Sequence, residues 1–235
     1  MKFSVVLPVH NEEDMLLRTF PTICELNPNE TIIILDRCSD SSEDVIRSLA
    51  KIYKIDVKII KNESLSNWHI HLNFLYKLGV ERARNDICFL TQADIALDQR
   101  IKDYIHYAQK SIVFFRHIPY FGWNTFVAMF LSNMPFIARS SGLVAFNKNF
   151  FKKYNLIEDV DLLFDTQIAV KVKAYKIPCM YIKTISWNLR YPGDRRRLYD
   201  VGAARKKLQR SFIETLLLCM LRLQPEVLVG YLRSK

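Results

Sequence analysis

Four acidic residues stand where they could do chemistry. Asp36 and Asp94 each follow an apolar run that is typical of a buried strand, and Glu158 and Asp159 head a later segment with a helical pattern. If the two strands are parallel, Asp36 and Asp94 emerge at the carboxyl edge of one sheet, where open α/β sheets bind ligands. A divalent cation on a diphosphate would be held there, because Mg²⁺ and Mn²⁺ combine one or two carboxylates with phosphate oxygens and water. A separate carboxylate such as Asp159 could act as general base for a hydroxyl nucleophile.

Each of these acids also has a purely structural interpretation. An aspartate after a strand often caps the next helix, which would account for Asp36 and Asp94. Acids at a helix N-terminus are stabilised by the helix dipole, which would account for Glu158 and Asp159. The choice between the two interpretations depends on the elements that position the four side chains.

These elements alternate between strand and helix along the chain. Repeated units of this kind predict an α/β fold with a mostly parallel, twisted sheet flanked by helices and joined by right-handed crossovers. No Gly-x-Gly-x-x-Gly or Walker loop occurs, which argues against an ordinary dinucleotide or P-loop site. The predicted strands cover residues 3–9, 31–35, 56–60 and 87–94. The first predicted helix begins with Asn11 as its N-cap, the second ends near Leu49, and the third covers about 68–84.

The later part of the chain continues the mixed pattern. It predicts a helix near 99–109, a strand over 111–118, a semi-buried helix or lid over 120–137, and then a strand, a helix after Asp159 and a last strand before residue 188. Residues 120–137 are too short and too interrupted for a membrane span. Beyond residue 188 the pattern indicates a basic loop and helices, either an interfacial amphipathic helix or a plain core or dimer helix.

Composition limits the class of protein. The chain has 235 residues, half of them hydrophobic, which is enough for a sizeable core. Its five cysteines are scattered and predict reduced thiols in a cytosolic chain, and the N-terminus starts a strand pattern without a secretory signal. The net charge of +10 lies entirely in residues 148–235, which carry 18 Lys or Arg and 8 Asp or Glu. Such a region suits phosphates, nucleic acid or an anionic membrane, or is a solvated helix face.

Four stretches, in this order, resemble motifs of the inverting family 2 glycosyltransferases, which have the GT-A fold. They are "SVVLPVHNEE", "IIILDRCSDSSEDVI", "LGVERARNDICFLTQAD" and "IEDVDLLFDTQIAVKVKAYKI", and together they span about residues 3–183. The resemblance implies a GT-A catalytic domain over residues 1–188, with a nucleotide-binding half over about 1–95 and an acceptor half over about 96–188. Residues 189–235 would add the basic loop and C-terminal amphipathic helices.

The resemblance also implies roles for individual residues. Asp94 would coordinate Mg²⁺ or Mn²⁺ on the sugar diphosphate, Asp159 would be the catalytic base, and Glu158 would support that base or contact the acceptor. Arg195 and Arg196 would clamp phosphate oxygens from a loop, since arginine can bind them with two hydrogen bonds. The nucleotide pocket would be formed by Pro8, Val9, Asn11, Glu12, Asp36, Arg37 and Gln92.

Three positions depart from the family pattern. Gln92 stands where the first aspartate of the metal motif is expected, so one carboxylate is missing. Arg37 stands where many members have the aspartate that reads uracil, which leaves guanosine and other donors open beside uridine. Lys77 replaces a common asparagine.

The resemblance therefore predicts a metal-assisted, inverting transfer of a sugar from a nucleotide-sugar to a hydroxyl or phosphate of a glycan or lipid-linked acceptor. The protein would be cytoplasmic, peripheral on the inner face of the cell membrane through its C-terminal helix, with no nucleic-acid partner. The sequence indicates no oligomeric state. Two alternatives are a nucleotidyltransferase on a related core, which normally has a glycine-rich N-terminal loop, and a non-catalytic protein that binds nucleic acid or membrane through its basic region.

Overall fold

The structure is a computed structural model of the whole chain. It describes residues 1–64, 68–118, 142–158, 160, 162–190, 206, 211–222 and 225–233. The chain divides into two compact units, one formed by residues 1–118 and 138–189 and the other by residues 119–137 and 190–235.

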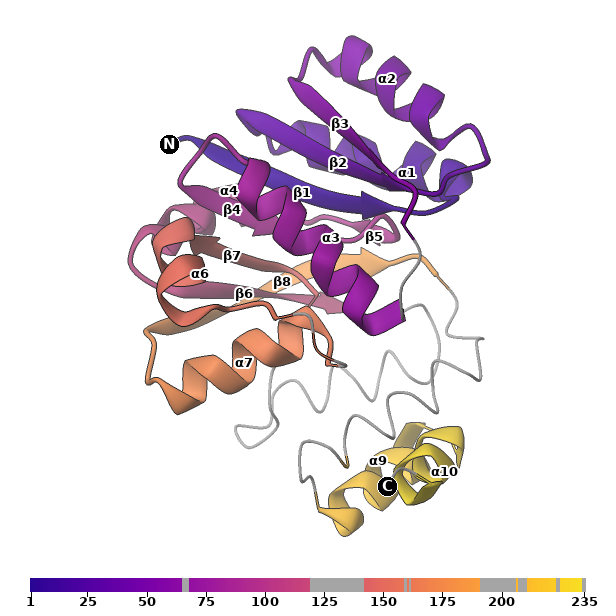
Figure 1. The fold of residues 1–235 in the computed structure, drawn as a ribbon, viewed down its shortest axis with the longest axis vertical. Helices are drawn as coiled ribbons and strands as arrows, with labels where there is room; N and C mark the ends of the chain where they lie inside the picture. Colours follow the sequence, from indigo (N-terminus) through magenta and orange to yellow (C-terminus); the bar gives the residue numbers. More distant parts are fainter. Residues whose placement is uncertain are drawn as a thin grey trace. The chain divides into compact units, whose positions relative to one another are not determined.

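The first half of the larger unit is a parallel βα repeat, as predicted (Figure 1). Neighbouring strands run parallel in the order β3-β2-β1-β4, and all seven residues of β2 are buried, as expected for a strand covered on both faces. The elements are β1 (Phe3–Val9), α1 (Glu13–Glu25), β2 (Glu30–Asp36), α2 (Ser42–Tyr53), β3 (Val57–Asn62), α3 (Trp68–Arg82) and β4 (Ile87–Leu90).

The second half extends the same sheet with mixed pairings. Beyond β4 the order continues β7-β6-β8-β5, where β7 is antiparallel to β4 and β6, and β6 is parallel to β8. The elements are β5 (Ile95–Ala96), α4 (Ile101–Tyr104), the 3₁₀ helix η1 (Ile105–Gln109), β6 (Ile112–Ile118), β7 (Val144–Asn147), α6 (Lys148–Tyr154), α7 (Phe164–Ala174) and β8 (Cys179–Asn188). The predicted α/β sheet flanked by helices is thus confirmed.

Helices cover both faces of the sheet and enclose two hydrophobic cores. Alternate residues of β1 divide between them: Leu7 belongs to the core that contains residues of α1 and η1, whereas Val6 belongs to the core that contains residues of α3, α6 and α7. In Figure 1, α3 crosses the front of the sheet and α1 is seen behind it. This division follows from the period of two along a strand, which sends successive side chains to opposite faces.

Two predicted boundaries near the candidate site are wrong. Asn11 is not the N-cap of α1; the capping position is Glu12, and Asn11 has a left-handed φ of 51°. The strand predicted to run to Asp94 ends at Leu90, because its partner β7 pairs only as far as that residue. Asp94 instead lies in a turn with Ala93 and immediately precedes the short strand β5.

Gly79 allows α3 to approach β1 closely, and its replacement is expected to destabilise the larger unit. A Cβ at this position would lie 2.3 Å from Val6 Cγ1 and 3.0 Å from Ile34 Cδ1. Both neighbours are fully buried, and Val6 is β-branched and stiff, so Gly79→Ala should cost about 1–3 kcal/mol, as overpacking does. Urea unfolding measures the cost.

Gly142→Ala is the matched control for this substitution. Its Cβ would meet the Gln92 side-chain amide at 2.3 Å, but that is the end of a flexible side chain, which can rotate away. A cost for Gly79→Ala no larger than for Gly142→Ala would contradict the close packing of α3.

Within its described residues the smaller unit has the helices α9 (Phe212–Arg222) and α10 (Pro225–Arg233), which pack together. The rings of Phe212 and Tyr231 lie 6.2 Å apart, and Cys219 and Val227 are buried. None of the helices in the described ranges is both long and apolar enough to cross a membrane. The predicted helix or lid over 120–137 lies outside the described residues.

Candidate active site

The direction in which strands are added to the sheet reverses at β1. The chain adds β2 and β3 on one side of β1 and then crosses through α3 to add β4 on the other side. Ligands of open α/β sheets bind at such a switch point, outside the carboxyl ends of the strands. The loop after β1 begins after Pro8 and Val9 with residues 10–12, and the loop after β4 carries Gln92 and Asp94. These predicted pocket residues thus lie at the carboxyl edge of the parallel strands, as the strand pattern predicted.

Asp36, at the end of β2, is enclosed by hydrogen-bond donors. Its Oδ1 lies 2.7 Å from His71 Nε2 and accepts a 2.9 Å hydrogen bond from Asn62 Nδ2. The Arg37 guanidinium donates to both carboxylate oxygens, at 3.2 Å from Nε and 2.9 Å from Nη2. His10 Nδ1 lies 2.6 Å from the Asp36 carbonyl oxygen. The carboxylate is thus a buried anchor, only 1% exposed, whereas the Arg37 side chain is 28% exposed.

These contacts make the stability of the fold dependent on pH below 4. Burial alone would raise the pKa of Asp36, but hydrogen bonds from Arg37, His71 and Asn62 outweigh it and lower the pKa from 3.8 to about 2. Because the folded state has the lower pKa, the stabilisation is complete above pH 3.8 and is lost as the pH falls through about 2. The parent should lose about 2 kcal/mol of unfolding free energy between pH 5 and pH 2 that Asp36→Asn does not lose.

Urea unfolding of both proteins across this range tests the prediction. The loss measured for Asp36→Asn must be subtracted from the loss measured for the parent, because hydrogen bonds from Arg100 also lower the pKa of Asp98 to about 2. Equal losses in parent and variant would show that Asp36 is not stabilised by its partners.

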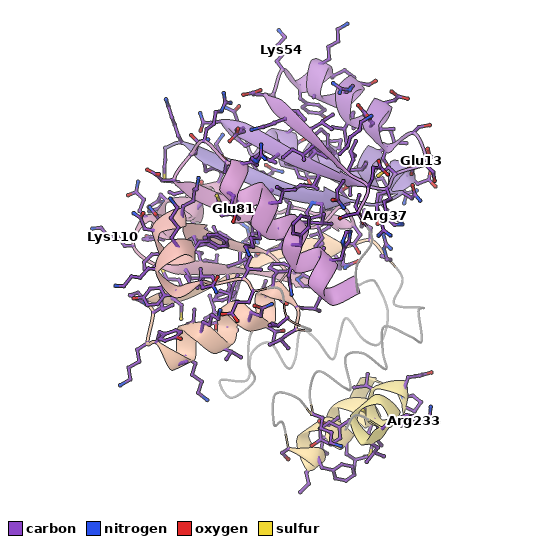
Figure 2. The ribbon with its side chains drawn as sticks, viewed as in Figure 1. Glu13, Arg37, Lys54, Glu81, Lys110 and Arg233 are labelled. Atoms are coloured by element: carbon purple, nitrogen blue, oxygen red, sulfur yellow. The ribbon has the colours of Figure 1, made fainter. Side chains whose placement is uncertain are left out.

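The loops after β1 and β2 are joined by hydrogen bonds. Asn11 Oδ1 accepts from the Ser39 backbone N–H at 2.8 Å, and Ser42 Oγ accepts from the Glu12 N–H at 2.9 Å. Glu13 accepts from the Ser41 N–H at 2.8 Å. Figure 2 shows Glu13 and Arg37 at the carboxyl edge of β1 and β2, and Lys110 far from it. The first loop is therefore held in place before any ligand binds.

Asp94 is positioned from three directions and is 6% exposed. The carbonyl oxygen of the preceding Ala93 accepts a 2.6 Å hydrogen bond from Thr19 Oγ1 of α1. The Asp94 carbonyl oxygen accepts from the Leu189 N–H at 2.7 Å, and its Oδ2 lies 3.5 Å from Asn188 Nδ2. The end of β8 thus fixes the turn that carries this carboxylate.

The donor set at this turn fits a divalent cation that is mostly held by its substrate. In the described ranges no three His, Cys, Asp or Glu side chains group as metal ligands. Gln92, whose amide packs against Gly142, supplies a neutral side chain where a second carboxylate was expected. Mg²⁺ or Mn²⁺ needs only one or two protein carboxylates when diphosphate and water complete the shell, so Asp94 satisfies this requirement.

Glu158 lies apart from these residues in sequence, between α6 and α7. Its Oε1 accepts hydrogen bonds from Lys171 Nζ and, at 3.3 Å, from Asn155 Nδ2. Its backbone N–H donates to Gln167 Oε1 at 2.7 Å. The predicted base Asp159 and the predicted phosphate ligands Arg195 and Arg196 lie outside the described residues.

The buried partners of the site were not predicted from the sequence. Asn62 could have been found, because it ends β3 in register with Asp36 at the same edge of the sheet. His71 gave no such signal, since nothing in its local pattern indicates a contact 35 residues away. The amides of Asn73 and Gln167, which bind the loop around Glu158, were missed for the same reason.

A family model described as Glycosyl transferase family 2 matches residues 4–170, more than half of the chain. No curated protein sequence matches this chain significantly.

Solved structures resemble the chain in fold. S. aureus TarS 1–349 in complex with UDP is 15% identical with a TM-score of 0.63, and the match covers 87% of this chain and 65% of TarS 1–349. Glucosyl-3-phosphoglycerate synthase from Mycobacterium tuberculosis, in complex with Mn²⁺, UDP and phosphoglyceric acid, is 11% identical with a TM-score of 0.55, covering 88% and 76%. A putative glucose-1-phosphate thymidylyltransferase from Bacillus anthracis is 8% identical with a TM-score of 0.56, covering 86% and 95%. At these identities the likeness shows the fold alone.

Proposed function

Since the chain belongs to glycosyl transferase family 2 and has the predicted GT-A fold of a glycosyltransferase, we propose that it transfers a sugar from a nucleotide-sugar to an acceptor hydroxyl or phosphate with inversion. The observation that carries this proposal is the position of Asp94, buried at the switch point of the sheet and inside the family match. Residues 1–188 would form the catalytic domain, and residues 189–235 would add the basic region.

The nucleotide is proposed to lie across the carboxyl ends of β1 and β2. The loop of Asn11 and Glu12 would line its ribose side, with Pro8, Val9 and Gln92 closing the pocket. Asp36 is too deeply engaged to read the base, since its two oxygens already receive four close contacts at 2.7 to 3.2 Å. Its role would be to hold Arg37, whose side chain is partly exposed and whose guanidinium is suited to the acceptor atoms of a base.

The reaction would be an in-line displacement at the anomeric carbon. Asp159 accepts the proton of the acceptor hydroxyl as the new C–O bond forms, and the bond from C1 to the diphosphate oxygen breaks. The nucleoside diphosphate leaves with the bonding electron pair. Glu158, fixed by Lys171, would support the acceptor side, and Arg195 and Arg196 would bind phosphate oxygens. Mg²⁺ or Mn²⁺ held by Asp94 would neutralise charge on the leaving diphosphate.

The alternative of a nucleotidyltransferase shares the same core but breaks a different bond. It would release pyrophosphate, and it normally has a glycine-rich loop near the N-terminus, where this chain has "PVHNEE". Family membership favours glycosyl transfer. A purely binding protein would need neither Asp94 nor Asp159.

Product analysis with a panel of sugar nucleotides tests the proposal. Purified protein with Mn²⁺ and candidate acceptors should release a nucleoside diphosphate, and the donor base is identified first by thermal shift with the free nucleoside diphosphates. Arg37→Ala should reduce the shift given by the preferred base while leaving inorganic diphosphate binding unchanged. Release of pyrophosphate, or no response to any nucleotide, would overturn the proposal.

We also propose that the protein is cytoplasmic and meets a lipid-linked or glycan acceptor at the inner face of the cell membrane. On α9 the side chains at helical spacing Ile213, Leu217 and Met220 are 67%, 51% and 60% exposed. Residues 190–235 carry eleven Lys or Arg and four Asp or Glu, so an exposed apolar stripe is combined with positive charge. Both features favour anionic lipid.

Flotation with anionic and zwitterionic vesicles tests this surface. The parent should float with anionic vesicles only, and serine at all three stripe positions should abolish flotation. Ile52→Ser, at an exposed apolar position of α2, is the matched control. Flotation that survives the triple substitution would contradict the proposed contact.

A further inference from the structure

The segment between α6 and α7 is held by two buried amide side chains. Asn73 reaches it from α3 and Gln167 from α7, and they are 0% and 3% exposed. This segment carries Glu158 and the proposed base Asp159. Loops generally lie on the surface and satisfy their backbone groups with water, so two buried side chains devoted to one loop require an explanation.

The two amides make five hydrogen bonds to the backbone on both sides of residue 159. Asn73 Nδ2 donates to the carbonyl oxygens of Val160 at 2.9 Å and Leu162 at 2.8 Å. Gln167 Nε2 donates to the carbonyl oxygens of Glu158 at 3.1 Å and Leu162 at 2.6 Å. Gln167 Oε1 accepts from the Glu158 N–H at 2.7 Å. The peptide groups of residues 158, 160 and 162 are therefore fixed by side chains from two separate helices.

These hydrogen bonds fix the orientation of the segment's backbone as well as its position. Gln167 binds both the N–H and the carbonyl of Glu158, as a neighbouring strand would, which prevents rotation of that residue's backbone. Asn73 belongs to the helix that also carries His71, the partner of Asp36, and Tyr76, whose hydroxyl donates to the Thr91 carbonyl at 2.8 Å. The loop of the acids is thus connected through α3 to the two strand ends that would hold the donor.

We propose that Asn73 and Gln167 are positioning residues that set the location of the Asp159 carboxylate relative to the acceptor. This inference rests on the proposed function. A general base acts only within hydrogen-bond reach of the proton it removes, and a displacement of 1 Å can cost about a hundredfold in rate. Neither amide touches the reactants; each acts through the backbone that carries Asp159.

The test exchanges each amide for the isosteric acid. Asn73→Asp and Gln167→Glu keep the shape but replace the NH₂ donor with an oxygen that repels the loop carbonyls. Each should lower kcat by about 10- to 100-fold, while the KM for the donor and the Kd for its nucleoside diphosphate stay within about twofold. Gln99→Glu is the matched control, because its amide donates to the Thr22 carbonyl at an exposed site, and it should leave kcat unchanged.

A double-mutant cycle separates positioning from loss of structure. In an Asp159→Asn background, Asn73→Asp should change the residual rate by less than about twofold, because the group it positions is gone. A general structural defect would lower the rate in both backgrounds, and this outcome, or a normal kcat for both amide variants, would overturn the inference. Circular dichroism provides the folded fraction, and Gln167→Glu repeats the cycle if Asn73→Asp folds poorly. Full activity of Asp159→Asn alone would refute the proposed base instead, which keeps the two failures distinguishable.

Discussion

Asp159→Asn is expected to lower kcat by about 10²- to 10⁴-fold, the range over which general-base catalysis contributes. The amide keeps the shape of the side chain but cannot accept the proton of the acceptor hydroxyl. Binding of the donor should change little, because the base acts on the acceptor. The measurement is the steady-state release of nucleoside diphosphate with and without acceptor, together with the Kd of the donor.

Asp161→Asn is the matched control, since it removes an acid two residues away in the same segment. The kcat of this control should stay within a few fold of the kcat of the parent. If the two variants lost activity equally, the effect would come from the charge of the segment and not from a base at residue 159. If Asp159→Asn kept the parental kcat, another residue would have to accept the proton.

Asp94→Asn is expected to lower kcat/KM by about a thousandfold in the presence of Mn²⁺, which is the second large effect. Lewis-acid stabilisation of a leaving diphosphate is worth several kcal/mol, and about 4 kcal/mol corresponds to that factor. Because Gln92 leaves a single carboxylate at this turn, the loss of Asp94 cannot be offset by a neighbour there. Chelation of metal from the parent should reduce activity to a similar extent.

Two variants distinguish metal binding from damage to the turn. Asp103→Asn removes an exposed acid in the nearby α4 and should leave the activity unchanged. Gln92→Asp restores a second carboxylate and should lower the Mn²⁺ concentration needed for half activity. An Asp94→Asn protein with parental activity and parental Mn²⁺ dependence would refute the assignment.

The N-terminal half of the fold could be predicted because its signals are local. The strands β1, β2 and β4 are short apolar runs, and parallel strands deliver their last residues to one edge, so the placement of Asp36 follows from the pattern. Asp94 lies four residues beyond the end of β4, which the pattern did not predict. The mixed half has no comparable signal. That β8 pairs with β6 along most of its length and with β5 at its end depends on contacts between residues more than 65 positions apart.

Asn11 illustrates why local rules fail at the site itself. Its type and its place before three acids are those of an N-cap. In the structure its side chain accepts a hydrogen bond from the Ser39 backbone N–H in the loop after β2, and this tertiary contact replaces the helix cap. The same holds for Asn73 and Gln167, which look like ordinary polar residues of helices until their distant backbone partners are known.

The contacts of α3 imply that the spacing of residues within this helix is as important as their identity. His71, Asn73, Tyr76 and Gly79 contact, in turn, Asp36, the acid loop, the turn after β4 and β1. Each residue added to a helix rotates the rest by about 100° and advances it by about 1.5 Å. One alanine inserted after Leu72 would therefore break the match between His71 and all three later contacts. We expect such a protein to lose cooperative unfolding, whereas the same insertion after Lys51, near the exposed end of α2, should leave it intact.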